Sequence, residues 1–155
     1  MIQKSKLGFT LIELMVAISI AGILMMVAIP SFQEFMRNNE LRSVSNGLYN
    51  AMLVAKNEAM TRNSHVLVAP YKDGDWKAGW RIFVDVNRDN SFGDGDVLIS
   101  EFADVPVNIA ISSINTSYVM YDGSGFSKQS NGAPFMGTIS VTRKDTSAAS
   151  QIRRI

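Results

Sequence analysis

Residues 9–29 read FTLIELMVAISIAGILMMVAI, and this run of 21 residues carries a single charge, at Glu13. An α-helix rises about 1.5 Å per residue, so a helix of this length spans the roughly 30 Å hydrocarbon core of a bilayer. The residues before it read MIQKSKLG and include Lys4 and Lys6. Positive charge on this side of an apolar span orients the short N-terminus toward the cytoplasm and the rest of the chain outward.

Outside this run, the 155-residue chain has an ordinary polar composition and room for one small globular domain. Its 15 basic and 14 acidic side chains give a net charge of +1, so no general attraction to nucleic acid or to an anionic surface is expected. The absence of cysteine excludes disulfides, thiolate metal sites and a cysteine nucleophile. The domain beyond the span must therefore be stabilised by its packed core.

Two general explanations of the apolar run are a cleaved secretory signal peptide and a plain membrane anchor. A signal peptide requires small residues at a cleavage site after the apolar core, and MVAIP at residues 26–30 is a poor site. A plain anchor leaves Glu13 unexplained, because an unpaired carboxylate in lipid is energetically costly. The carboxylate therefore needs a partner.

The stretch Gly8-Phe9-Thr10-Leu11-Ile12-Glu13 resembles the processing signal of type IV pilins and pseudopilins, with a short basic leader, Gly, Phe, and Glu four residues later. The resemblance implies that residues 1–8 are a leader peptide, that a prepilin peptidase cleaves between Gly8 and Phe9, and that Phe9 is then N-methylated. Cleavage creates a cationic amine on Phe9, with which Glu13 can pair within one subunit or between neighbours. In the family, the apolar helix, here residues 9–29, later leaves the membrane and packs in the core of a filament.

Beyond Pro30, apolar residues recur at steps of three and four, as on one face of an amphipathic helix. This face consists of Leu41, Val44, Leu48, Met52, Ala55 and Ala59. With Asn63 closing its end, the pattern predicts one continuous helix of roughly 50 residues, about 75 Å long. Gly22 and Pro30 are its weak points, because glycine costs about 1 kcal/mol in a helix and proline removes a backbone donor and favours a kink.

After Ser64 the sequence changes to short segments separated by Gly, Asp and Asn, a pattern typical of antiparallel strands. The predicted strands are His65–Ala69, Trp80–Asp85, Val97–Phe102, Asn108–Ile114, Tyr118–Tyr121, Gly137–Thr142 and Gln151–Ile155. We therefore predict an α+β protein in which a long N-terminal helix, transmembrane in its first half and amphipathic in its second, packs against antiparallel β-sheet. The resemblance implies the type IV pilin fold, with residues 30–155 forming the head domain.

A second resemblance narrows the family. Residues 76–85 read WKAGWRIFVD and are followed by Asn87, Asp89 and Asp96, which is similar to a Trp-x-x-Gly-Trp…Phe-x-Asp-x-Asn run in minor pilins and pseudopilins of the GspH/FimT/FimU kind. Residues 57–63 are also similar to that branch, although Lys56-Asn57 departs from its usual pattern. Because the tryptophan motif belongs to low-copy subunits, the resemblance favours a minor subunit over a major pilin.

The run DVNRDNSFGDGD, which begins at Asp85, spaces its oxygen-bearing residues as in a calcium loop. Asp85, Asn87 and Asp89 occupy the first, third and fifth places and Asp96 the twelfth. Asn90 stands at the sixth place, where such loops have glycine, and the flanking segments read as strands and not as helices. We therefore favour a hairpin loop in which Asp, Asn and Gly serve turn geometry, and we expect no metal or other cofactor.

Two other groups of residues have a structural and a functional interpretation. Trp76, Trp80 and Phe83 could form an aromatic contact surface, but packing in the core is the favoured interpretation. His65 is the single histidine of the chain and lacks a paired nucleophile, so a structural role is expected for it. The sequence contains neither a nucleotide-binding loop nor a nucleophile motif, and we predict that the protein is not an enzyme.

DNA binding needs consideration, because the resemblance implies that some relatives act in DNA uptake through a basic Gly-Arg-x-Arg-like tail. This chain has Arg143, Lys144, Arg153 and Arg154 near its end but no Gly-Arg-x-Arg. It stops at Ile155, about where the family's last strand is expected to begin, so the tail is either truncated or different. Four basic residues in a nearly neutral chain give weak electrostatics for DNA, and nucleic acid is not expected as a partner.

Together these features predict a minor pilin of a type IV pilus that promotes pilus assembly, for motility or adhesion, within the filament or its initiating or tip complex. Before assembly it would lie in the bacterial inner membrane with its head in the periplasm. The resemblance implies three partners, namely the prepilin peptidase and N-methyltransferase, other minor and major pilins, and an inner-membrane assembly platform. Two alternatives remain open: a minor pseudopilin of a type II secretion system, and a DNA-binding pilin in natural transformation.

Overall fold

The structure, a computed structural model, describes residues 8–72, 74–114 and 117–144 together with the backbone of residues 153–154. A single helix precedes a series of short strands. The elements are α1 (Leu11–Arg62), β1 (Val66–Lys72), β2 (Asp75–Val84), β3 (Val97–Phe102), β4 (Ile109–Ile114), β5 (Val119–Tyr121), β6 (Ser127–Lys128), β7 (Thr138–Arg143) and β8 (Arg153–Arg154). The chain divides into two compact units, Met1–Asn39 and Glu40–Ile155, and α1 contributes to both.

The helix confirms the prediction of one continuous element. α1 has 52 residues and contains Pro30 within it. It ends where the sequence predicted, because Asn63 adopts a left-handed conformation with φ of 47°. The N–H of Ser64 then donates to the carbonyl of Ala59 over 3.2 Å, which is the bond of a Schellman motif.

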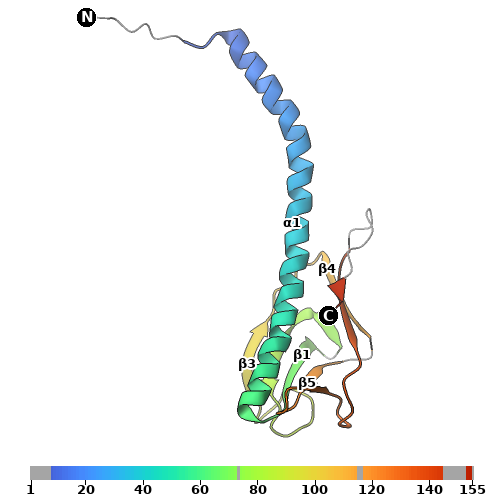
Figure 1. Cartoon of the computed structure of the whole chain (residues 1–155). Helices are drawn as coiled ribbons and strands as arrows, with labels where there is room; N and C mark the ends of the chain where they lie inside the picture. The colour runs from blue at the N-terminus through green and yellow to red at the C-terminus, as the bar shows by residue number, and fades with distance from the viewer. Residues whose placement is uncertain (1–7, 73, 115–116, 145–152, 155) are drawn as a thin grey trace, which may run out of the picture. The chain divides into compact units, whose positions relative to one another are not determined.

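Two antiparallel sheets lie against the part of α1 that belongs to the second unit (Figure 1). Their strand orders are β3-β2-β1-β5-β6 and β4-β7-β8. β1 is the central strand of the larger sheet, since Val66 pairs with Val84 on one side and with Tyr121 on the other. In the smaller sheet Ile111 pairs with Val141. The predicted α+β arrangement, a long N-terminal helix packed against antiparallel β-sheet, is thus confirmed.

The core of the second unit forms between one face of α1 and the inner faces of both sheets. Residues at steps of three and four on α1 are buried, as the amphipathic pattern predicted. The buried set on the helix is Leu41, Val44, Ser45, Leu48, Ala51, Ala55 and Ala59. Met52, predicted to belong to this set, is only partly buried at its margin. The small side chains at 51, 55 and 59 allow the sheet to approach the helix closely.

The larger sheet has a second, smaller apolar cluster on its outer face. Val66 and Val68 of β1 belong to the core against α1, whereas Leu67 packs with Phe83 and Met120 in a separate buried cluster. Successive residues of a strand point to opposite faces, so both faces of this sheet bury apolar side chains. The outer face therefore requires a cover of its own.

The strands differ from the predictions in several places, and β1 continues to Lys72 where the predicted strand ended at Ala69. β2 begins at Asp75 and not at Trp80, because the hairpin with β1 continues to the Lys72–Asp75 pair. β6 was not predicted, since two residues carry too little alternation to indicate a strand. Within the predicted last strand, residues 153–154 pair with β7 as β8, and the remaining residues lie outside the described part of the chain.

Candidate assembly site

The N-terminus of α1 is closed by a pair of side chains, Thr10 and Glu13. The N–H of Thr10 donates to Oε2 of Glu13 and the N–H of Glu13 donates to Oγ1 of Thr10, both over 3.3 Å. The Thr10 hydroxyl also donates to Oε2 of Glu13 over 3.3 Å, and the Thr10 carbonyl accepts the first helical hydrogen bond from Leu14. This reciprocal arrangement is a capping box, in which Thr10 is the N-cap residue and Glu13 the third helical residue.

The capping box is a feature that our interpretation of the sequence missed, although its signal, Thr-x-x-Glu before an apolar run, is present. Gly8 and Phe9 immediately precede it, and all three residues 8–10 are exposed. The carboxylate of Glu13 is therefore held at the end of the helix, beside the residue on which cleavage is predicted to create an amine. Lys4, Lys6 and the rest of residues 1–7 lie outside the described residues.

The first half of α1 presents apolar side chains that no described residue covers. Residues 8–37 are all exposed, and the large hydrophobic side chains among them begin with Phe9, which is 89% exposed. This helix is long and apolar enough to cross a membrane by length and composition. Gly22 and Pro30 lie within it without interrupting it, and the predicted kink at Pro30 stays a prediction.

The tryptophan motif of β2 is a core element, as the favoured interpretation held. Trp76, Trp80 and Phe83 are each at most 2% exposed. The ring of Trp80 stacks on that of Phe102 in β3, with centroids 4.4 Å apart and planes at 10°. Both tryptophans belong to the core cluster that contains the buried residues of α1, so both indoles pack toward the helix.

Gly79, between the two tryptophans, is required by geometry. Its φ is +103°, and a Cβ placed there would lie 2.0 Å from the carbonyl oxygen of Phe102. Only glycine adopts this conformation without steric cost and leaves room for the neighbouring strand. The glycine of the Trp-x-x-Gly-Trp pattern therefore allows β2 to lie close to β3, while the two tryptophans of the pattern are buried in the core.

The Asp-rich loop between β2 and β3 brings together the acids that the calcium spacing singled out. Carboxylate oxygens of Asp85, Asp89 and Asp96 all lie within 4.8 Å of one another. Asp85 accepts hydrogen bonds from the N–H groups of Arg88 (2.7 Å) and Asn90 (3.0 Å).

The other acids of this loop are bonded in the same way. Asp96 accepts from the N–H groups of Val86 (3.0 Å) and Gly93 (2.9 Å). Asp89 accepts from the N–H of Ser91 (2.7 Å), and the fourth candidate, Asn87, accepts from the N–H of Asp89 (3.1 Å). Backbone donors thus hold these side chains as turn-forming residues, and the expectation that the loop binds no metal stays a prediction.

The same loop covers the outer face of the larger sheet. The ring of Phe92 meets that of Phe83 edge-on, with centroids 5.3 Å apart and planes at 67°. The guanidinium of Arg81 lies between two rings, 4.8 Å from the centroid of Phe92 and 4.7 Å from that of Tyr71. Sequence reasoning did not anticipate this role, because contacts between a loop and a sheet face leave no periodic signal.

The basic residues near the C-terminus are only partly described. Arg143 ends β7, and the ammonium of Lys144 donates to the carbonyl of Val107 over 2.5 Å. The backbones of Arg153 and Arg154 pair with Val141 and Ser140 of β7. Arg143, Arg153 and Arg154 thus lie on neighbouring strands and Lys144 directly follows β7, while the side chains of Arg153 and Arg154 lie outside the described residues.

His65 has a structural place, as expected. It is half-buried just before β1, and its carbonyl accepts a hydrogen bond from the N–H of Asp85 over 3.0 Å. This bond closes the end of the β1–β2 hairpin.

Comparisons with known proteins agree with this architecture. The fold is similar to that of the type IV minor pilin FimU of Pseudomonas aeruginosa strain PAO1, with a TM-score of 0.57 and 16% identity over 78% of this chain and 85% of that chain. A second crystal form of FimU gives a TM-score of 0.51 and 14% identity over 74% of this chain and 84% of that chain. At such low identity the likeness concerns the fold.

Sequence comparisons address the family. The fimbrial protein EcpC of Eikenella corrodens is 39% identical over 46 residues, which are 30% of this chain and 30% of EcpC. Residues 3–29 match the profile described as the prokaryotic N-terminal methylation motif, and residues 44–154 match that of the type II transport protein GspH. The chain therefore belongs to the GspH family of type IV pilin-like proteins, which are structural subunits and not enzymes.

Proposed function

We propose that this chain is a minor pilin of a type IV pilus, a subunit of the filament or of its initiating or tip complex that promotes pilus assembly. The observation that carries the proposal is the first half of α1, whose apolar side chains are all exposed and whose apolar run, residues 9–29, has one carboxylate, held at the capped end of the helix. Such a surface suits a membrane before assembly and the packed helices of a filament afterwards.

We assign a separate role to each of three segments of the chain, beginning at the N-terminus. Residues 1–8 form the leader, and cleavage between Gly8 and Phe9 exposes an amine that is methylated on Phe9. The Thr10–Glu13 capping box holds the carboxylate near that amine, where opposite charges stabilise one another in a medium of low polarity. Residues 9–29 then serve as membrane anchor and filament core, while residues 30–155 form the head that contacts other subunits.

A pilus role is supported by two similar proteins, one a type IV minor pilin and the other a fimbrial protein. The matching family is described as a type II transport protein, which supports the second candidate, a minor pseudopilin of a type II secretion system. Both functions use the same processing, the same membrane storage in the inner membrane and the same filament-core helix. They differ in which filament receives the subunit.

A clean deletion in the native host tests the proposal, scored together for surface pili with twitching, for secretion of a type II substrate, and for transformation by added DNA. We expect loss of pili with normal secretion, restored by the full-length gene. Loss of secretion with intact pili would contradict the pilus role and assign the chain to the secretion system. Piliated cells that fail only in transformation would contradict both and favour DNA uptake.

A further inference from the structure

We infer that the open edge of β3, together with the groove between β3 and α1, receives an extended segment of another pilin-like subunit by β-strand addition. Among the described residues, β3 is an outermost strand of the larger sheet and pairs with β2 alone. An outermost strand exposes a row of unpaired backbone N–H and C=O groups, to which a further strand can bind. The inference rests on the proposed function only in that the partner is another subunit of a filament.

The C-terminal part of β3 is the part to which a further strand can bind. Ile82 pairs with Ser100 and Phe83 pairs with Leu98, so Ile99 is an extra residue in a β-bulge. The regular portion is therefore residues 100–102. β3 contains neither lysine nor proline, the residues that usually protect such edges from pairing.

The backbone of Glu101 is the group that points to the open side. The carbonyl of Phe102 lies against Gly79 of β2, because a Cβ on that glycine would be 2.0 Å from the Phe102 oxygen. Backbone groups of successive residues point to opposite sides of a strand within the sheet plane. The N–H and C=O of Glu101 consequently face away from β2.

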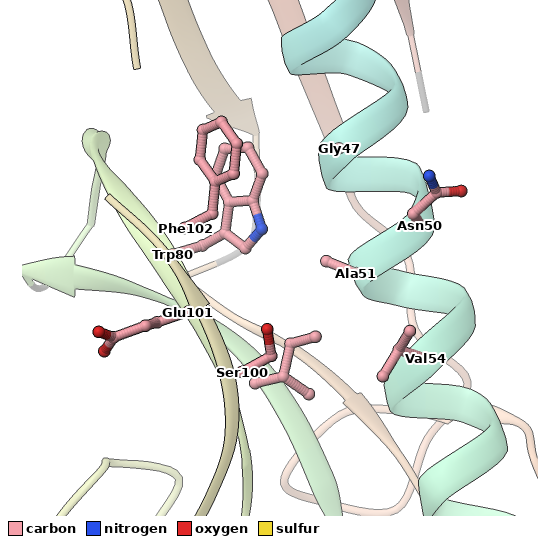
Figure 2. Close-up of a pocket in the computed structure, with 9 residues that line it drawn as sticks. Gly47, Asn50, Ala51, Val54, Trp80, Ser100, Glu101 and Phe102 are labelled. Atoms are coloured by element: carbon pink, nitrogen blue, oxygen red, sulfur yellow. The ribbon is translucent and has the colours of Figure 1, made fainter. Parts of the chain in front are cut away.

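A groove next to this edge provides room for side chains of the added strand (Figure 2). It has a volume of about 190 Å³ and lies between Gly47, Ala51 and Val54 of α1 and Trp80, Ser100 and Phe102 of the sheet. Figure 2 shows Trp80 and Phe102 on the side that faces the helix and Glu101 pointing away from it. Alternate side chains of an added strand would enter this groove, so they must be apolar and of moderate size.

The acidic residues of this region indicate which charges the partner segment should carry. Between Asp85 and Asp104 the chain has six acidic residues and a single basic one, Arg88. Residues 89–127 contain no lysine or arginine at all. Of these acids, Glu101 on the edge and Asp104 just beyond it are exposed at the proposed contact, and they favour a segment with Lys or Arg flanking its apolar residues and disfavour nucleic acid.

The chain lacks cysteine, so a thiol at the edge can report the contact. Ser100→Cys is nearly isosteric, and Ser130→Cys, an exposed position on another loop, is the matched control. Full-length variants are expressed in the native host, labelled with a thiol-reactive benzophenone, irradiated, and analysed by mass spectrometry of the crosslinked peptides. We expect Ser100→Cys to crosslink to one extended segment of a different pilin-like subunit, with alternating apolar residues and flanking Lys or Arg.

An edge-blocking variant tests the mode of binding. Added to Ser100→Cys, Glu101→Pro removes an outward donor without removing a hydrogen bond to β2, and we expect it to lower the crosslink about tenfold. Glu101→Gln, which keeps the N–H group and an acceptor for Tyr71, should leave the crosslink within about twofold. Should the proline variant unfold, Asn50→Phe fills the groove from an exposed position of α1 and should lower the crosslink similarly, with Asn57→Phe as its control.

Three results would overturn the inference. They are a crosslink at Ser100 no stronger than that at Ser130, a crosslink only to a second copy of this chain, and a yield that neither Glu101→Pro nor Asn50→Phe changes. The crosslink tests the contact itself, whereas the pilus and secretion phenotypes of the deletion test the proposed function. Either can therefore fail without the other.

Discussion

Thr10 and Glu13 hold each other at the start of α1, each donating its backbone N–H to the other's side chain over 3.3 Å. The single acid of the apolar run is thus a helix cap as well as a candidate ion-pair partner. The two roles are compatible, because the capping bonds keep the carboxylate at the helix end, where a positive amine and the positive end of the helix dipole both favour it.

Removal of the Thr10 hydroxyl should weaken assembly through this cap. Thr10→Val retains the shape of the side chain but loses a cap of about 1 kcal/mol, so we expect normal processing and several-fold less subunit in sheared filaments. Thr10→Ser, which keeps the hydroxyl, is the control. Glu13→Ala should also be processed yet incorporate poorly, and abundant incorporation of that variant would exclude the pairing role of Glu13.

Replacement of Gly8 by a bulky acid should block processing. Gly8→Glu crowds the bond to Phe9 that we propose is cleaved, so the chain should keep its leader and stay in the membrane fraction. The measurement is the gel mobility and N-terminal mass of the protein in cells that contain the prepilin peptidase. Release of Phe9 as the N-terminus of the Gly8→Glu protein would refute the proposed cleavage position.

Alanine at Gly79 should destabilise the head strongly. The φ of +103° and the 2.0 Å approach of a Cβ to the Phe102 oxygen predict a loss of about 3 kcal/mol or more in the free energy of unfolding. Gly74→Ala is a matched control, since φ there is +72° but nothing lies within 4 Å, and about 1–2 kcal/mol is expected. Urea unfolding in detergent, followed by the emission of the buried Trp76 and Trp80, measures both. Equal losses would contradict the steric explanation.

The Asp-rich loop should depend on amide hydrogen bonds and not on a cation. Asp85 is 3% exposed and accepts two backbone bonds, so Asp85→Asn should cost about 1–3 kcal/mol by leaving one donor unpaired. Asp94→Asn, at an exposed position, should change little. We expect the wild-type unfolding midpoint to be the same with a chelator and with added Ca²⁺. A rise with Ca²⁺ that Asp85→Asn abolishes would instead establish a calcium site.

Acid should weaken the β5–β6 turn through Asp122. The hydroxyl of Ser124, and then the N–H groups of Phe126 and Ser124, hold the pKa of this carboxyl below its usual value of 3.8. A lowered pKa in the folded state contributes stability above pH 3.8 that is lost as the pH falls through the folded value. Between pH 6 and pH 3, the urea midpoint of Asp122→Asn should therefore fall less than that of the wild type. Parallel falls would assign the acid sensitivity to other groups.

The long helix was predictable because its signal is local. Steps of three and four from Leu41 to Ala59 and the closing Asn63 each depend on neighbours in the chain, and the structure confirms both. The start of β2 at Asp75 and the two-residue β6 were not predictable, since each depends on a partner strand and not on a periodic pattern. The capping box lay between the predictable helix and the unpredictable strands. Its Thr-x-x-Glu motif is present in the sequence, but only the structure shows the hydrogen bonds between the two residues.

The sequence by itself determined the family, the apolar helix with its acid at Glu13, the pilin-like architecture and the burial of the two tryptophans. These features are encoded in composition, spacing and short motifs that act over a few residues. Only the tertiary structure decided that the Asp-rich loop folds Phe92 over Phe83, that Gly79 must leave room for the Phe102 carbonyl, and that β3 ends a sheet beside an open groove. Those relationships join residues far apart in the chain, and long-range packing leaves no periodic signal in the sequence.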